Sequence, residues 1–234
     1  MERTPLYERY RPKTWNEVIG QDAAVRDIQR LIALGEIGGN AYWISGGSGT
    51  GKTTIAKLLA TELADSEFVQ EIDATDLTPA GLNQIEGDFS LSAWGKGGRV
   101  IIVNEAHGLR SDTIKKLLVV LERIPSHCVW IFTTTKEGEK DLFGDSIDTM
   151  PLISRCIRLS LTSRNLCQAF AVRAHGIATI EGRNGSDVKK YERFLKDNGN
   201  NMRALLQAVQ RGAFLGEENG VSATSNQEHP TTTE

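Results

Sequence analysis

The sequence predicts an α/β fold: a parallel sheet flanked by helices, followed by a small all-helical lid. Within residues 21–162, short and nearly continuous apolar runs alternate with amphipathic segments, as expected for strands covered on both faces. A glycine-rich loop joins one of these runs to a helical segment. From residue 163 onward the pattern is helical only, which predicts a separate lid over residues 163–215.

The individual elements follow from apolar spacing. A segment of residues 1–20 precedes a helix at 21–34, which has Ala24 and Ile28 on its apolar face and ends at Gly35. Strands are predicted at residues 41–44, 68–72, 99–103 and 128–132, and core helices at 54–62 and 111–123. Lid helices are predicted at 163–175, 187–196 and 201–214. The polar tail 216–234 is expected to be disordered.

Charge balance, cysteine spacing and apolar run length limit which partners and which cellular compartment the sequence suits. The 27 basic and 30 acidic residues nearly balance, so any DNA contact must come from a local patch, for which Lys96, Arg99 and Arg110 are candidates. Three cysteines at spacings that fit no zinc or redox motif predict reduced thiols in the cytoplasm. No apolar run approaches the ~20 residues that a membrane span needs.

The glycine-rich loop satisfies the pattern G-x-x-x-x-G-K-[ST] in full and stands between a predicted strand and a predicted helix. Such a P-loop turns consecutive backbone N–H groups toward phosphate oxygens at a helix N-terminus. In this motif Lys52 reaches the β- and γ-phosphates and Thr53 ligates magnesium. The sequence therefore predicts binding of a nucleotide, ATP, with Mg²⁺, through Gly46, Gly47, Ser48, Gly49, Thr50, Gly51, Lys52, Thr53 and Thr54.

A second motif, Asn104-Glu105-Ala106-His107, follows the strand predicted at 99–103, where a parallel sheet presents ligand-binding residues. With the P-loop, the YRPKT and VIGQ sequences within residues 7–21, the Ser154-Arg155-Cys156 triplet and residues 199–203, it resembles the clamp-loader branch of the AAA+ ATPases. The resemblance covers roughly residues 7–210 and implies the P-loop AAA+ fold.

The resemblance also implies roles for single residues. Arg11, Pro12 and Ile19 would contact the adenine and ribose, although a plain packing segment is the alternative. Glu105 would polarise the attacking water, which needs an ionised carboxylate near the γ-phosphate. His107 fits the family pattern but is expected to be a structural polar residue.

Three further roles are implied by position. Thr135, or less favourably Thr134, matches the polar sensor that orients the same water, although β-propensity alone would account for these threonines. Arg155 resembles the arginine finger that completes a neighbouring subunit's site in trans. Arg203 matches the second sensor, which reports the γ-phosphate to the lid.

The sequence departs from the family in several places. Asn104 stands where the family has aspartate, which removes a negative charge from the water shell around magnesium and predicts weaker support for the ion. The four-cysteine zinc module of the bacterial subunits is missing, so no zinc is expected. A polar tail follows the predicted lid, so we expect no helical collar of the kind that ties clamp loaders together, and assembly as the standard pentamer is not expected. The segment 137–150 is longer than the family's usual link.

The leading interpretation is an ATP-hydrolysing AAA+ subunit that acts in DNA replication, with other AAA+ subunits, a sliding clamp and primer-template DNA as partners. Two alternatives stay open. Asn104 favours a nucleotide-gated scaffold subunit that hydrolyses little. The missing collar favours an AAA+ motor with another client, such as a Holliday-junction or transposition regulator, whereas the YRPKT sequence favours clamp loading.

Overall fold

The computed structural model describes residues 4–91, 93–135 and 150–215. Its centre is a five-stranded sheet with the strand order β2-β3-β4-β1-β5, in which every pair of neighbours is parallel. The strands are β1 (Asn40–Ser45), β2 (Val69–Asp73), β3 (Arg99–Asn104), β4 (Cys128–Thr134) and β5 (Cys156–Ser160). Because all strands are parallel, their carboxyl ends meet at one edge of the sheet, where the candidate site lies.

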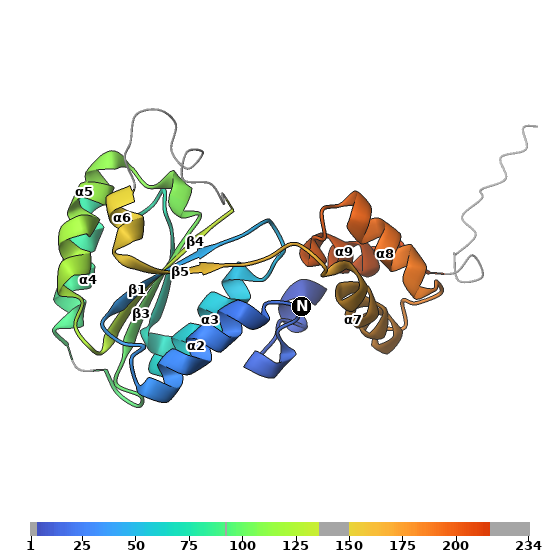
Figure 1. Ribbon diagram of the computed structural model, residues 1–234, viewed down its shortest axis with the longest axis horizontal. Coiled ribbons are helices and arrows are strands. Elements are labelled where there is room, and N and C mark those ends of the chain that lie inside the picture. The colour runs from blue at the N-terminus through green and yellow to red at the C-terminus, as the bar shows by residue number, and fades with distance from the viewer. Residues whose placement is uncertain (1–3, 92, 136–149, 216–234) are drawn as a thin grey trace, which may run out of the picture.

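Helices cover both faces of the sheet (Figure 1). On one face, α2 (Asp22–Leu34) and α3 (Lys52–Leu63) pack against Tyr42 and Ile44. On the other, α4 (Pro79–Phe89) and α5 (Ser111–Val120) pack against Trp43. Successive side chains of β1 therefore enter opposite cores, as the pleat of a strand requires. This arrangement explains why β1, β3 and β4 read as nearly unbroken apolar runs.

The remaining helices form a separate group beside the sheet (Figure 1). The helices α7 (Cys167–Ile180), α8 (Val188–Asp197) and α9 (Met202–Gln210) share a third apolar core. The short helix α1 (Leu6–Arg9) joins them, because Leu6 is buried in that core and its backbone N–H donates to Gln210 Oε1 at 3.0 Å. The N-terminal segment thus lies between the sheet and the helical group.

The α/β fold with a parallel sheet is confirmed, and the four predicted strands are present. Three elements of the sheet and its covering helices were not predicted: β5, α4 and the short helix α6 (Met150–Ser154). β5 is only partly buried and so lacks a continuous apolar run. α4 contains the poor helix formers Gly81 and Gly87, although Thr78 caps it and Pro79 begins it.

The first lid helix begins later than the sequence predicts. The prediction started at Ser163, whereas α7 starts at Cys167. Asn165 has a φ of 59°, a left-handed conformation that cannot belong to a right-handed helix. The helix can therefore form only after this residue.

The smaller elements complete the description. They are α6 (Met150–Ser154) and the 3₁₀ turns Trp15–Glu17, Ser66–Phe68, Ala106–Gly108 and Leu121–Arg123. No helix in the described ranges is long and apolar enough to cross a membrane. The expected disorder of the tail 216–234, and all of the long link 137–150 except Met150, lie outside the described residues. The division into domains remains a prediction.

Candidate functional site

The P-loop connects β1 to α3 with a backbone that only glycine adopts easily. Gly46, Gly49 and Gly51 have φ angles of 155°, 77° and 106°. A Cβ atom on Gly49 would lie 2.1 Å from Asn201 Oδ1, and one on Gly46 would lie 2.9 Å from Leu161 Cβ. The loop is therefore a bare backbone cradle at the N-terminus of a twelve-residue helix. Such a cradle presents N–H groups and a positive dipole end to an anion.

Lys52 is held inside this cradle. Its Nζ atom donates to the carbonyl oxygens of Gly46 at 2.8 Å and of Gly47 at 2.9 Å. The residue is only 8% exposed, which is rare for a lysine. The loop thus fixes an ammonium group next to the N–H groups that would receive phosphate oxygens.

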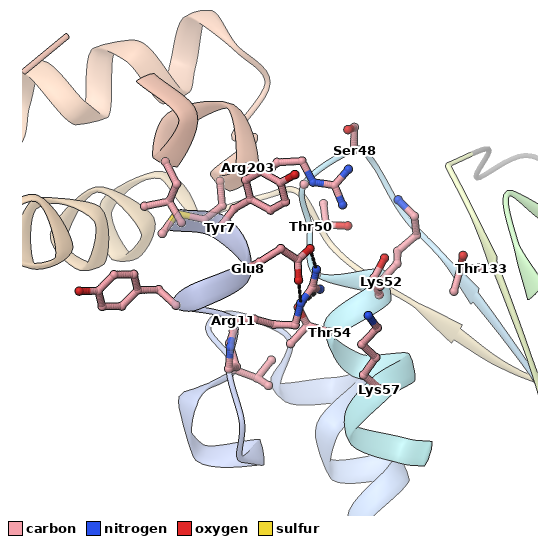
Figure 2. A pocket seen from close by; sticks show the side chains of 18 of the residues that line it. Tyr7, Glu8, Arg11, Ser48, Thr50, Lys52, Thr54, Lys57, Thr133 and Arg203 are labelled. Carbon is pink, nitrogen blue, oxygen red and sulfur yellow. Dashed lines mark hydrogen bonds and ion pairs between the residues drawn. The ribbon is translucent and has the colours of Figure 1, made fainter. Parts of the chain in front are cut away.

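A cavity of about 440 Å³ opens beside the loop, bounded by the N-terminal segment, the strand ends and α9 (Figure 2). The predicted residues that line it are Arg11, Pro12, Ile19, Ser48, Gly49, Thr50, Gly51, Lys52, Thr53, Thr54, Asn104, Glu105, Thr135 and Arg203. Gly46, Gly47 and Arg155 do not line it. Thus residues up to 192 positions apart, from Arg11 to Arg203, meet around one cavity.

Glu105 stands at the end of β3 in an unusual backbone conformation, with a φ of 50°. A left-handed glutamate is uncommon, and such strain clusters at functional sites. Its Oε2 atom accepts a hydrogen bond from Thr135 Oγ1 at 3.3 Å. Thr134, by contrast, is fully buried and meets His107 Nδ1 at 3.3 Å. Of the two threonines, Thr135 is therefore the one placed beside the carboxylate in the cavity.

Asn104 is fixed by hydrogen bonds on both sides of its amide. Its Nδ2 atom donates to Glu71 Oε1 at 2.7 Å, and its Oδ1 atom accepts from Thr133 Oγ1 at 3.0 Å. Glu71 also forms an ion pair with Lys57, with 3.1 Å between Oε2 and Nζ. Glu71, Lys57 and Thr133 line the cavity, yet no motif in the sequence indicates them.

On the N-terminal side of the cavity, the carboxylate of Glu8 holds the side chain of Arg11 in place (Figure 2). Glu8 accepts hydrogen bonds from Arg11, whose Nη1 atom also donates to Thr54 Oγ1 at 3.2 Å. The hydrogen bond from Arg11 holds the pKa of Glu8 below its usual value. The guanidinium of Arg203 lies over the ring of Tyr7, 5.5 Å from its centroid. Arg11 and Arg203 thus line the cavity with intramolecular partners that the sequence did not reveal.

Two side chains form hydrogen bonds between the P-loop and the neighbouring segments. Asn201 caps α9 by accepting from Ala204 N at 3.1 Å, and its Nδ2 atom donates to Ser48 Oγ at 3.3 Å. Gln21, which is 3% exposed, donates to the carbonyl oxygens of Thr50 and Thr162. The loop therefore contacts both the lid helix α9 and the connection that leads to the lid.

Arg155 lies outside the cavity, between α6 and β5. Its guanidinium donates to Glu122 Oε1 at 2.6 Å and to the carbonyl oxygen of Pro151 at 2.8 Å. About one third of the side chain is exposed. In this position Arg155 cannot serve the cavity of its own chain.

The candidate DNA-facing charges are spread over different parts of the core. Lys96 donates to the carbonyl oxygen of Thr61, and Arg99 lies 5.0 Å from the ring centroid of Phe68. Arg99 begins β3, whereas Arg110 follows the carboxyl end of that strand and precedes α5. A contact between these residues and DNA stays a prediction.

Two of the cysteine thiols are held in their protonated form. Burial raises the pKa of Cys128 to about 11 and that of Cys156 to about 12, so neither is a thiolate at neutral pH.

Among the described residues, no group of three or more His, Cys, Asp or Glu side chains could hold a metal ion.

Comparison with known proteins relates the chain to a family of ATPases and to subunits of DNA polymerase III. Residues 42–156 match the model of the ATPase family associated with various cellular activities (AAA). The chain is 32% identical over 159 residues to the DNA polymerase III subunit gamma/tau of Mycoplasma pneumoniae, which covers 57% of this chain and 23% of that protein. It is 27% identical over 204 residues to the subunit tau of Bacillus subtilis, covering 77% of this chain and 34% of that protein. The chain thus spans about a third or less of these relatives.

Solved structures show the same fold. The RuvB Holliday junction branch migration motor of Thermotoga maritima superposes with a TM-score of 0.62. The match covers 86% of this chain and 64% of that one at 22% identity, a level at which the likeness concerns the fold alone.

Proposed function

We propose that this chain, an AAA+ ATPase of the clamp-loader type, binds and hydrolyses ATP with Mg²⁺ as one subunit of a cytoplasmic assembly that acts in DNA replication. Its partners would be other AAA+ subunits, a sliding clamp and primer-template DNA. The observation that carries the proposal is the grouping of the P-loop, Glu105, Thr135 and Arg203 around one cavity while Arg155 stands outside it. This grouping suits a site that one chain builds and a neighbour completes.

The residues present fit a magnesium nucleotide. The glycine cradle leaves space where a Cβ atom would intrude, and Lys52 supplies a fixed cation. Thr53, at the start of α3, would hold the magnesium ion, with Asn104 supporting its water shell. The bound ion would supply charge neutralisation on the phosphates.

The chain's own residues would then bind and position the reactants. The Glu105 carboxylate would accept the proton of the attacking water, and the hydrogen bond from Thr135 would fix the orientation of that carboxylate. Arg203, on α9, would respond to the γ-phosphate and move with the lid. Arg155 would stabilise charge in the site of a neighbouring subunit.

The test is ATP turnover by the purified chain, measured over a range of protein concentrations, alone, with primed DNA, and with primed DNA plus a sliding clamp. We expect specific turnover to rise with concentration, because Arg155 acts between subunits, and to rise further with clamp and DNA. Turnover that is independent of concentration and of both ligands would contradict the proposal. A response to four-way junction DNA instead of primed DNA would indicate a different client.

A second function, a nucleotide-gated scaffold with weak hydrolysis, is favoured by Asn104. Such a subunit would bind ATP through the P-loop and supply Arg155 to a partner without much turnover of its own. Tight ATP binding together with negligible single-turnover hydrolysis, in the presence of DNA and clamp, would favour this second function over the first.

A further inference from the structure

We propose that Glu71 supplies, through its hydrogen bond to Asn104, the negative charge that Asn104 itself lacks at the magnesium side of the cavity. The inference rests on the proposed function, since it concerns the same nucleotide site. Glu71 precedes Asn104 by 33 residues and belongs to a different strand, so the P-loop and strand-end motifs do not include it.

The direction of the hydrogen bonds explains why an amide suits position 104. A carboxylate can only accept, so the NH₂ group of Asn104 must face Glu71, where the distance is 2.7 Å. The amide oxygen is then left for the hydroxyl of Thr133, at 3.0 Å. Thr133 is 3% exposed, so this second bond anchors the amide to the core. The amide therefore links a charged group in the cavity to a fixed point in β4.

The strand register brings the carboxylate to the same edge as Asn104. β2 and β3 are parallel, and Asp73 is paired with Asn104. Glu71 lies two residues earlier, and hence on the same face of the sheet as Asp73. Both side chains line the cavity. The negative charge is thus moved one strand away from its position in the family, but it stays beside the site.

An aspartate at position 104 would conflict with Glu71. It would bring two carboxylates together where an amide now donates across 2.7 Å, and one of them would have to take up a proton. Asn104 and Glu71 are therefore a matched pair. It follows that the weakening of magnesium support expected from Asn104 alone is offset by Glu71.

Glu71 has one other partner that could explain its presence. Its Oε2 atom pairs with Lys57 Nζ at 3.1 Å, and both side chains are more than one third exposed. Exposed ion pairs of this kind contribute little to the free energy of folding. The same pair could nevertheless orient Lys57 toward the cavity, so the experiment must separate these two roles of Glu71.

The experiment measures the Mg²⁺ concentration needed for half-maximal binding of a fluorescent, non-hydrolysable ATP analogue. Four proteins form a double-mutant cycle: wild type, Glu71→Gln, Asn104→Asp and the double variant. Binding without Mg²⁺ is measured in parallel, as evidence that each variant is folded. Asp73→Asn is the matched control, because it removes a neighbouring carboxylate from the same strand and cavity. Lys57→Gln removes the other partner of Glu71.

We expect Glu71→Gln to raise the half-saturating Mg²⁺ concentration by about 10- to 100-fold, the usual effect of losing a partner that supports a metal's ligands. Asn104→Asp should lower the half-saturating Mg²⁺ concentration toward the wild-type value in the Glu71→Gln background. In the wild-type background it should give little or no gain, because Glu71 faces the new carboxylate. Asp73→Asn and Lys57→Gln should leave Mg²⁺ dependence near that of wild type.

Equal effects of Asn104→Asp in both backgrounds, no effect of Glu71→Gln, or the same shift from Asp73→Asn or Lys57→Gln would overturn the inference. A wild-type protein that binds no ATP analogue at all would instead overturn the proposed function.

Discussion

The P-loop and the ends of β2 and β3 face the same cavity but are built differently. In the loop, Lys52 is held by carbonyl groups five and six residues away and is 8% exposed. At the strand ends, Asn104 is held by side chains 33 and 29 residues away, and the side chain of Glu105 is 54% exposed. One region is thus an enclosed, local backbone structure, and the other is an open network of side chains. In the first region the fixed cation is held by the loop itself, whereas in the second we propose that a neighbouring strand supplies the charge.

The largest effect is expected in the enclosed region. Lys52→Ala should abolish detectable ATP binding, because it removes the cation that the loop fixes beside its N–H groups. Lys115→Ala, which removes an exposed lysine from α5, is the matched control and should change nothing. Calorimetric titration with ATP checks both. Wild-type affinity in Lys52→Ala would show that the loop is not the phosphate site.

The second-largest effect is expected at Arg155, which belongs neither to the P-loop nor to the strand ends. Arg155→Ala should leave ATP affinity nearly intact but lower turnover of the assembly by about 10³- to 10⁵-fold, the range for arginine fingers that act in trans. The comparison is with Glu122→Gln, which removes the negative charge beside Arg155 but keeps the guanidinium, and which should leave turnover close to that of wild type. If Arg155→Ala turns over ATP as fast as wild type at every protein concentration, Arg155 is no finger.

The smallest effect concerns the contact between the lid and the P-loop. Asn201→Ala and Asp187→Ala each remove an N-cap, from α9 and α8, and should each lower the free energy of unfolding by about 0.5–2 kcal/mol. Because Asn201 alone also contacts Ser48, only Asn201→Ala should weaken ATP binding as well. Thermal melts and ATP titrations of the pair test this. Equal ATP affinities would mean that the lid contact does not support the loop.

The same contrast explains what could be predicted from sequence. The strands β1, β3 and β4 are visible because burial on both faces makes them nearly continuous apolar runs, and the P-loop is visible because glycine is obligatory at its left-handed positions. Glu71 and Glu8 could not be predicted, since their positions depend on strand order and on chain segments that meet only after folding. The start of α7 was misplaced because nothing in its periodicity reveals the left-handed Asn165.

Within the one cavity, we propose that the P-loop binds ATP and that Glu105 is needed only for its hydrolysis. Glu105→Gln tests it most directly, because the exposed side chain can be changed without disturbing the loop. ATP affinity and single-turnover hydrolysis should be measured on the same preparation, next to wild type. We expect unchanged affinity with hydrolysis reduced by about 10²- to 10⁴-fold, the usual contribution of a general base. Hydrolysis at the wild-type rate, or loss of binding together with hydrolysis, would contradict it.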